Sequence, residues 1–147
     1  MSKKLSYKGK LAIGEQDRIK LSTINGKRGY KINKFQIIST TPGTGNVELV
    51  SKITKVTDTN IGPTAKFTDA DLLGVAFYSG NENAAYPFSE TIIFDNEKFN
   101  QDIFVSMADA DGGTVPGNYY IELETMNLSD LETTMLTLKS LRTVTSR

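Results

Sequence analysis

Two acidic side chains in the segment 109–113 have the spacing of metal ligands. Asp109 and Asp111 stand at alternate positions before two glycines, as the first oxygen ligands of a calcium loop do before its sharp turn. The segment lacks the third Asx residue that a calcium loop has before its glycine. Residues 114–117 (TVPG) follow, without the glutamate that closes such a loop. We therefore expect an acidic hairpin loop, and a weak cation site at Asp109 and Asp111 is the alternative.

Glu122 and Glu124 form a second acidic pair. Residues two apart on a strand share one face, so their side chains would stand roughly 7 Å apart, a separation that suits paired carboxylates in catalysis. The two glutamates alternate with Ile121 and Leu123, and this alternation is typical of a strand with one wet and one buried face. The preferred interpretation is a solvent-facing pair, and an enzyme that uses two carboxylates is the alternative.

The composition excludes most other catalytic devices. The 147 residues include no histidine and no cysteine, so the chain has no Ser-His-Asp or Cys-His pair, imidazole metal ligand, thiolate nucleophile or disulfide. We expect a protein that is not an enzyme, with no cofactor and no small-molecule substrate.

The densest basic patch is Lys27, Arg28, Lys31 and Lys34, next to the hairpin-turn signal Asn25-Gly26. The patch lacks the spacing of a phosphate-binding P-loop. The sequence pI near 6.3 and the scarcity of nearby aromatic residues also argue against a nucleic-acid partner. We expect either a solvated hairpin tip or a patch that faces another protein.

Charge is divided unevenly along the chain although the formal net charge is zero. Residues 1–66 carry 13 basic and 4 acidic side chains, whereas residues 67–127 carry 1 basic and 11 acidic. Two interpretations are open: strands from the two halves interleave and neutralise one another, or the molecule has a basic face and an acidic face that meet in neighbouring copies.

Apolar and polar residues alternate with a period of two along most of the chain, which predicts about eight short strands. We expect a mainly β domain over residues 1–127, a single antiparallel β-sandwich that is jelly-roll-like. The alternation slips in the third strand, which predicts a β-bulge near Asn33 and Lys34. Residues 57–71 predict a long connection that crosses from one sheet to the other. No apolar run is long enough for a membrane span.

The tail, residues 128–147, has a helical pattern instead. Ser129 and Glu132 have the spacing of a capping box, which predicts one short helix over about 130–142. Apolar residues recur on one side of this helix, at Leu131, Met135, Leu138 and Leu141. This stripe is expected to pack on the sandwich or to dock on a neighbouring subunit.

The C-terminal segment runs through Tyr119–Glu124 (YYIELE) and Met126–Leu131 (MNLSDL) to a leucine-rich helix that ends near Arg142. This segment, about the last 30 residues, resembles small virion structural proteins of bacteriophages, especially marine ones. The resemblance implies a β-sandwich or jelly-roll capsid or capsid-associated subunit. It implies that the partners are copies of the chain and other virion proteins, and that the chain is made in the host cytoplasm and located in the virion. It assigns a role to no single residue.

From these observations we expect a non-enzymatic virion subunit that assembles through sheet edges, the C-terminal helix and faces of opposite charge. The interface residues would be those of the helical stripe and the basic patch. The alternative is a carbohydrate- or host-surface-binding attachment module that uses tyrosines and Asn/Asp loops.

Overall fold

The computed structural model describes residues 3–21, 27–43, 46–81, 88–94 and 97–146, and in these ranges it contains eight strands and one helix. The helix, α1, spans Asp130–Ser146. The strands are β1 (Lys4–Leu11), β2 (Gln16–Ile19), β3 (Arg28–Ser39), β4 (Asn46–Thr54), β5 (Leu72–Asn81), β6 (Phe88–Ile93), β7 (Ile103–Asp109) and β8 (Gly117–Asn127).

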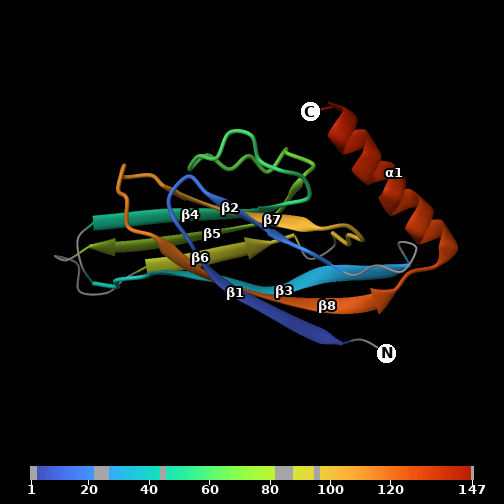
Figure 1. The fold of residues 1–147 in the computed structure, drawn as a ribbon, viewed down its shortest axis with the longest axis horizontal. Coiled ribbons are helices and arrows are strands. Elements are labelled where there is room, and N and C mark those ends of the chain that lie inside the picture. The colour runs from blue at the N-terminus through green and yellow to red at the C-terminus, as the bar shows by residue number, and fades with distance from the viewer. Residues whose placement is uncertain (1–2, 22–26, 44–45, 82–87, 95–96, 147) are drawn as a thin grey trace.

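The strands form two antiparallel sheets that face each other (Figure 1). The small sheet has the strand order β1-β8-β3, and the large sheet has the order β2-β7-β4-β5-β6. The expected fold class, a single antiparallel β-sandwich followed by a C-terminal helix, is confirmed.

The strand order is that of a jelly roll with one ladder changed. A jelly roll is a long antiparallel ribbon rolled into two sheets, so it pairs strand one with eight, two with seven, three with six and four with five. Here β1 pairs with β8, β2 with β7 and β4 with β5. The sixth strand is the exception, because β6 pairs with β5 and no ladder joins the described residues of β6 to β3.

The core lies between the inner faces of the two sheets. Along β8 every second residue from Gly117 to Thr125 is buried and the residues between them are partly exposed. The large sheet adds fully buried side chains from β4 and β7, including Leu49, Ile53 and Ile103. The alternation seen in the sequence is therefore the alternation between core and surface.

Two local expectations can be compared with the structure. The register between β3 and β8 shifts between Ile32 and Lys34, which confirms the β-bulge. The expectation for residues 57–71 was wrong, because β4 and β5 are neighbours in the large sheet and the connection does not cross to the small one. It folds back over the large sheet instead: Lys52 Nζ lies 3.2 Å from Asp58 Oδ2, and it donates to the Thr64 carbonyl at 3.1 Å.

Helix α1 begins with the expected capping box. The backbone N–H of Glu132 donates to Ser129 Oγ at 3.1 Å, and the backbone N–H of Ser129 donates to Glu132 Oε1 at 3.3 Å. The helix is longer than the expected 130–142 and continues to Ser146. It begins beside the small sheet just after β8 and runs past the end of the sandwich to beyond the large sheet (Figure 1).

Candidate functional site

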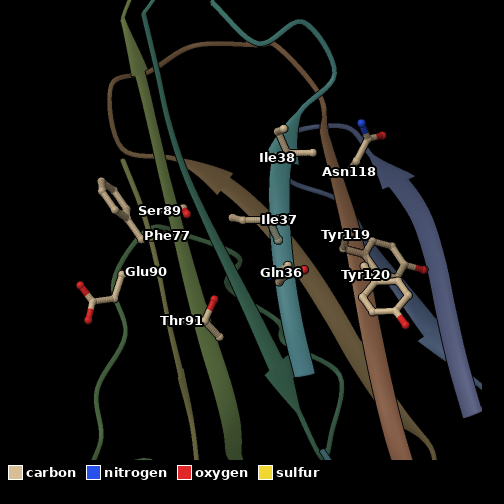
Figure 2. A pocket seen from close by; sticks show the side chains of 10 residues that line it. All are labelled: Gln36, Ile37, Ile38, Phe77, Ser89, Glu90, Thr91, Asn118, Tyr119 and Tyr120. Atoms are coloured by element: carbon tan, nitrogen blue, oxygen red, sulfur yellow. The ribbon is translucent and has the colours of Figure 1, made fainter. Parts of the chain in front are cut away.

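A groove opens between β3 and β6, where a jelly roll would have its third ladder. Its volume is about 580 Å³, within the range of about 300–1,000 Å³ that is usual for ligand sites. We call it the edge groove. Its lining residues are Gln36, Ile37, Ile38, Phe77, Ser89, Glu90, Thr91, Asn118, Tyr119 and Tyr120 (Figure 2).

The β6 wall of the edge groove carries hydroxyl groups. Ser89 and Thr91 lie on the side of β6 that faces β3, whereas the Glu90 carboxylate points away from β3 (Figure 2). Glu90 is paired in register with Phe77 of β5, on the outer surface of the large sheet. The two β6 lining residues that face β3 are therefore polar and uncharged.

The β8 wall is fixed by Tyr119, whose side chain is buried. Its hydroxyl donates to Asp17 Oδ2 at 3.0 Å, and burial together with this carboxylate raises the pKa of Tyr119. Gly9 of β1 lies opposite Tyr119, and a Cβ there would stand 2.7 Å from the Tyr119 oxygen. Because successive strand residues alternate, the inward position of Tyr119 places Tyr120 on the outer face of the small sheet.

Lysines from both edge strands flank β8 on this outer face. Glu124 lies in register between Lys4 of β1 and Lys31 of β3, and Lys31 Nζ is 3.5 Å from Glu124 Oε2. In the next row Glu122 lies opposite Lys34 of β3. Both glutamates are on the solvent-facing side of β8, as expected, and each has a lysine as its neighbour across the ladder.

At the other end of the same face, the lysines have no acidic residue directly opposite them in the ladder. Tyr120 lies opposite Lys8 of β1, and Asn118 lies opposite Lys10. Both lysines are exposed, and among the described residues neither forms an ion pair. We call Lys8 and Lys10 the open lysine pair.

The residues of the expected basic patch are distributed along β3. Lys31 and Lys34 face the two glutamates of β8, and Lys27 Nζ lies 3.9 Å from Asp130 Oδ1 at the start of α1. Arg28 pairs in register with Asn127. Three of the four cations thus have acidic neighbours from the second half of the chain.

The charge division of the sequence is interleaved in space. The acidic strand β8 lies between β1 and β3, and β7 lies between β2 and β4. The two halves therefore do not form two opposed faces, and the first of the two interpretations holds at the level of strands.

Asp109 and Asp111 have different environments. Asp109 is buried, and its Oδ1 accepts the backbone N–H of Asp111 at 2.8 Å, whereas the Asp111 side chain is exposed. Among the described residues no group of three or more acidic, histidine or cysteine side chains could hold a metal ion. Asp109 ends β7 and holds the turn that follows it, and the described part of the chain supplies no third ligand.

One side of α1 is tied to the sandwich. Lys98 Nζ donates to Glu132 Oε2 at 3.1 Å, and Asn100 Nδ2 donates to Thr137 Oγ1 at 3.3 Å. Leu136 lines a small cavity of about 20 Å³ beside Phe99. These contacts set which side of the helix faces inward.

The apolar stripe of α1 lies on a different side. Leu131, Met135 and Leu138 have exposed fractions of 69%, 56% and 54%, and we call these three residues the helix stripe. The side chain of Leu141 lies outside the described residues. The described part of the stripe does not pack on the chain's own sandwich, so the first of the two expected roles for these residues does not apply within the single chain.

Comparison with protein-family models, with curated proteins and with solved structures finds no match for this chain. In the part of the chain that the structure describes, no helix has both the length and the apolar character needed to cross a membrane.

No pattern in the sequence alone locates the edge groove or the open lysine pair. The alternation predicted that Tyr120, Lys8 and Lys10 would lie on strands, but their proximity depends on the β1–β8 register. The sequence indicates only that one of the adjacent residues Tyr119 and Tyr120 must face outward.

Proposed function

We propose that this chain is a non-enzymatic structural subunit that assembles with copies of itself. The observation that carries the proposal is the helix stripe, three large apolar side chains that are more than half exposed on a helix whose other side is held to the sandwich. A soluble chain that presents such a stripe gains free energy by covering it.

A second copy is the occupant that we propose. Full burial of a leucine or methionine contributes about 1.5–3 kcal/mol, and rather more than half of each side chain is still exposed. Burying the stripe would then contribute about 3–5 kcal/mol per copy, and twice that in a symmetric pair, in which both copies bury the same surface. Association itself costs about 4–15 kcal/mol, so the stripe supports a concentration-dependent association.

The edge strands of the two sheets differ in how well they suit a contact between copies. β1 and β3, the edges of the small sheet, carry lysines, which oppose pairing with another strand. β6 is the edge of the large sheet that borders the groove, and its Phe88 and Ile92 are exposed. We therefore place a second contact at β6.

We further propose that the assembly is a bacteriophage virion, with the chain as a capsid or capsid-associated subunit and other virion proteins as additional partners. Two observations support this step: the resemblance carried by residues 119–142, and the jelly-roll strand order, an architecture that recurs in viral capsid domains. The fold is an analogy here, because the same architecture also serves other functions.

Light scattering on the purified chain over a range of concentrations tests the proposal. The average mass is expected to rise with concentration, and Leu131→Ser/Met135→Ser/Leu138→Ser should shift the rise to concentrations at least about 100-fold higher, since each 1.4 kcal/mol is a factor of ten. The matched control is Thr134→Ala, an exposed substitution on the same helix. A wild-type chain that stays monomeric at millimolar concentration would contradict self-assembly.

The second candidate function is an attachment module that binds carbohydrate, and the edge groove favours it. The groove combines an aromatic ring, Tyr120, with the amides of Gln36 and Asn118 and the hydroxyls of Ser89 and Thr91. Jelly rolls also occur as lectin domains. Titration of the protein with a neutral hexasaccharide and its sulfated form, described below, tests this function separately from assembly.

A further inference from the structure

We propose that the edge groove and the open lysine pair form one binding site for an acidic saccharide, a sugar chain that carries sulfate or carboxylate groups. The inference rests on the second candidate function and names its ligand class. The evidence is the register of β1 against β8, which places two positively charged lysines beside residues that line the groove.

The two features share residues. Tyr120 and Asn118 line the edge groove, and the same two residues are the cross-ladder neighbours of Lys8 and Lys10. Side chains directly opposite each other in an antiparallel pair have Cβ atoms about 4.5–5.5 Å apart. A ligand that contacts Tyr120 or Asn118 is therefore within reach of a flexible lysine ammonium group.

The uncharged groups suit the body of a sugar. The Tyr120 ring offers an apolar face with a polar hydroxyl at its tip, against which the C–H face of a pyranose can pack. The side-chain amides of Gln36 and Asn118 both donate and accept, as neighbouring sugar hydroxyls do. Ser89 and Thr91 supply further hydroxyls from β6, which lies beyond β3 as seen from Tyr120 (Figure 2).

The charge arrangement selects for an acidic ligand and orients it. Lys8 and Lys10 are exposed, have no acidic neighbour across the ladder, and stand on the β1 side of the face. The acidic side chain in the groove lining, Glu90, points away from β3 (Figure 2). A sulfate or carboxylate would thus lie over β1, while the sugar rings extend towards β6.

The same face argues against a nucleic-acid strand as the ligand. A phosphate chain places a negative charge at every nucleotide and needs a continuous row of cations. Beyond the open lysine pair, the next two rows of the small sheet have Glu122 and Glu124 at their centre. A chain running along β8 would meet these carboxylates, whereas a short acidic saccharide would not.

Calorimetric titration of the full chain with sulfated laminarihexaose and with its unsulfated parent tests the inference. We expect the sulfated form to bind at least ten times more tightly at low salt, and the difference to shrink as salt screens the exposed charges. Lys8→Gln/Lys10→Gln should remove the difference. Lys4→Gln/Lys34→Gln makes the same change in net charge at lysines opposite Glu124 and Glu122, and it should preserve the preference.

The ring is tested by two substitutions of Tyr120. Tyr120→Phe keeps the stacking face and should bind within about three-fold of wild type, whereas Tyr120→Ala should lose about ten-fold or more, because the sugar ring loses the aromatic face on which it packs. Circular dichroism spectra and urea midpoints that match those of wild type would show that these exposed substitutions leave the fold unchanged.

Each of the remaining outcomes would refute a different part of the proposed site. Equal affinity for the sulfated and neutral sugars would refute the acidic ligand class and leave glycan binding standing. Binding of neither sugar would refute the site together with the second candidate function. If a twelve-nucleotide deoxythymidine strand bound as tightly as the sulfated sugar, the face would be a general polyanion surface. Equal losses in both lysine variants would refute the localisation at Lys8 and Lys10.

Discussion

Replacement of Gly9 by alanine should destabilise the protein through Tyr119. The added methyl group would lie 2.7 Å from the Tyr119 oxygen and 2.8 Å from two ring carbons. The ring cannot yield easily, because it is buried and its hydroxyl donates to Asp17. Overpacking of this kind costs about 1–3 kcal/mol, and loss of a hydrogen bond to a partly exposed carboxylate adds about 1.5 kcal/mol.

The expected total is about 3 kcal/mol of the free energy of unfolding, or a melting temperature lower by about 6–12 °C for a chain of this length. Urea denaturation followed by circular dichroism measures it. Gly74→Ala is the matched control: its Cβ would be no closer than 3.4 Å to any neighbour, so its effect should stay below about 1 kcal/mol.

A double-mutant cycle separates a clash with the Tyr119 ring from any destabilisation that alanine would cause in β1 without the ring. In a Tyr119→Ala background the methyl group at position 9 has room, so the cost of Gly9→Ala should fall to less than about 1 kcal/mol. If Gly9→Ala costs the same with and without the tyrosine ring, or costs nothing in the wild-type chain, the packing argument for Gly9 and Tyr119 is wrong.

Three further perturbations have outcomes that follow from single contacts. The pKa of Tyr119 is raised above its ordinary value of 10.0, so the stability that its protonated hydroxyl contributes is complete below about pH 10 and is lost as the pH rises further. Tyr119→Phe should therefore flatten the fall in urea midpoint above about pH 10. Lys52→Met leaves the largely buried Asp58 carboxylate without its 3.2 Å partner and should cost about 3 kcal/mol, with faster amide exchange in residues 57–71. Ser129→Ala removes the cap at 3.1 Å from the Glu132 N–H and should cost about 1 kcal/mol, seen as faster amide exchange in the first turn of α1.

Local features of this fold could be predicted from the sequence. The β-bulge in β3 and the capping box of α1 each depend on residues a few positions apart, and both are present. The alternation of apolar and polar residues likewise defines the strands, because it depends only on the two faces of an extended chain.

Features that depend on distant pairing could not be predicted in the same way. The β6 strand could pair with β3 or with β5, and no residue in the strand itself decides between them. The choice of β5 opens the edge groove. The same holds for the connection 57–71, because its length does not determine which sheet the chain returns to, and the chain returns to the large sheet.

The direction of the helix stripe was also undecided by the sequence. An amphipathic pattern shows that Leu131, Met135 and Leu138 share one side of α1, but it does not show what that side faces. Two contacts to the segment before β7, from Lys98 and Asn100, turn another side inward. As a result the stripe faces solvent.

Oxidation of methionine by dilute peroxide, read by mass spectrometry at increasing protein concentration, tests the self-assembly proposal most directly, since it needs no amino-acid substitution. Met135 is 56% exposed, Met107 is fully buried, and Met126 is partly exposed on β8 of the small sheet. Oxidation of an exposed methionine is fast and that of a buried one slow. The oxidation rate of Met135 should fall as the protein is concentrated while the rate of Met126 stays constant. A Met135 rate that is unchanged at concentrations where light scattering detects oligomers would show that the copies meet elsewhere, and the role proposed for α1 would be wrong.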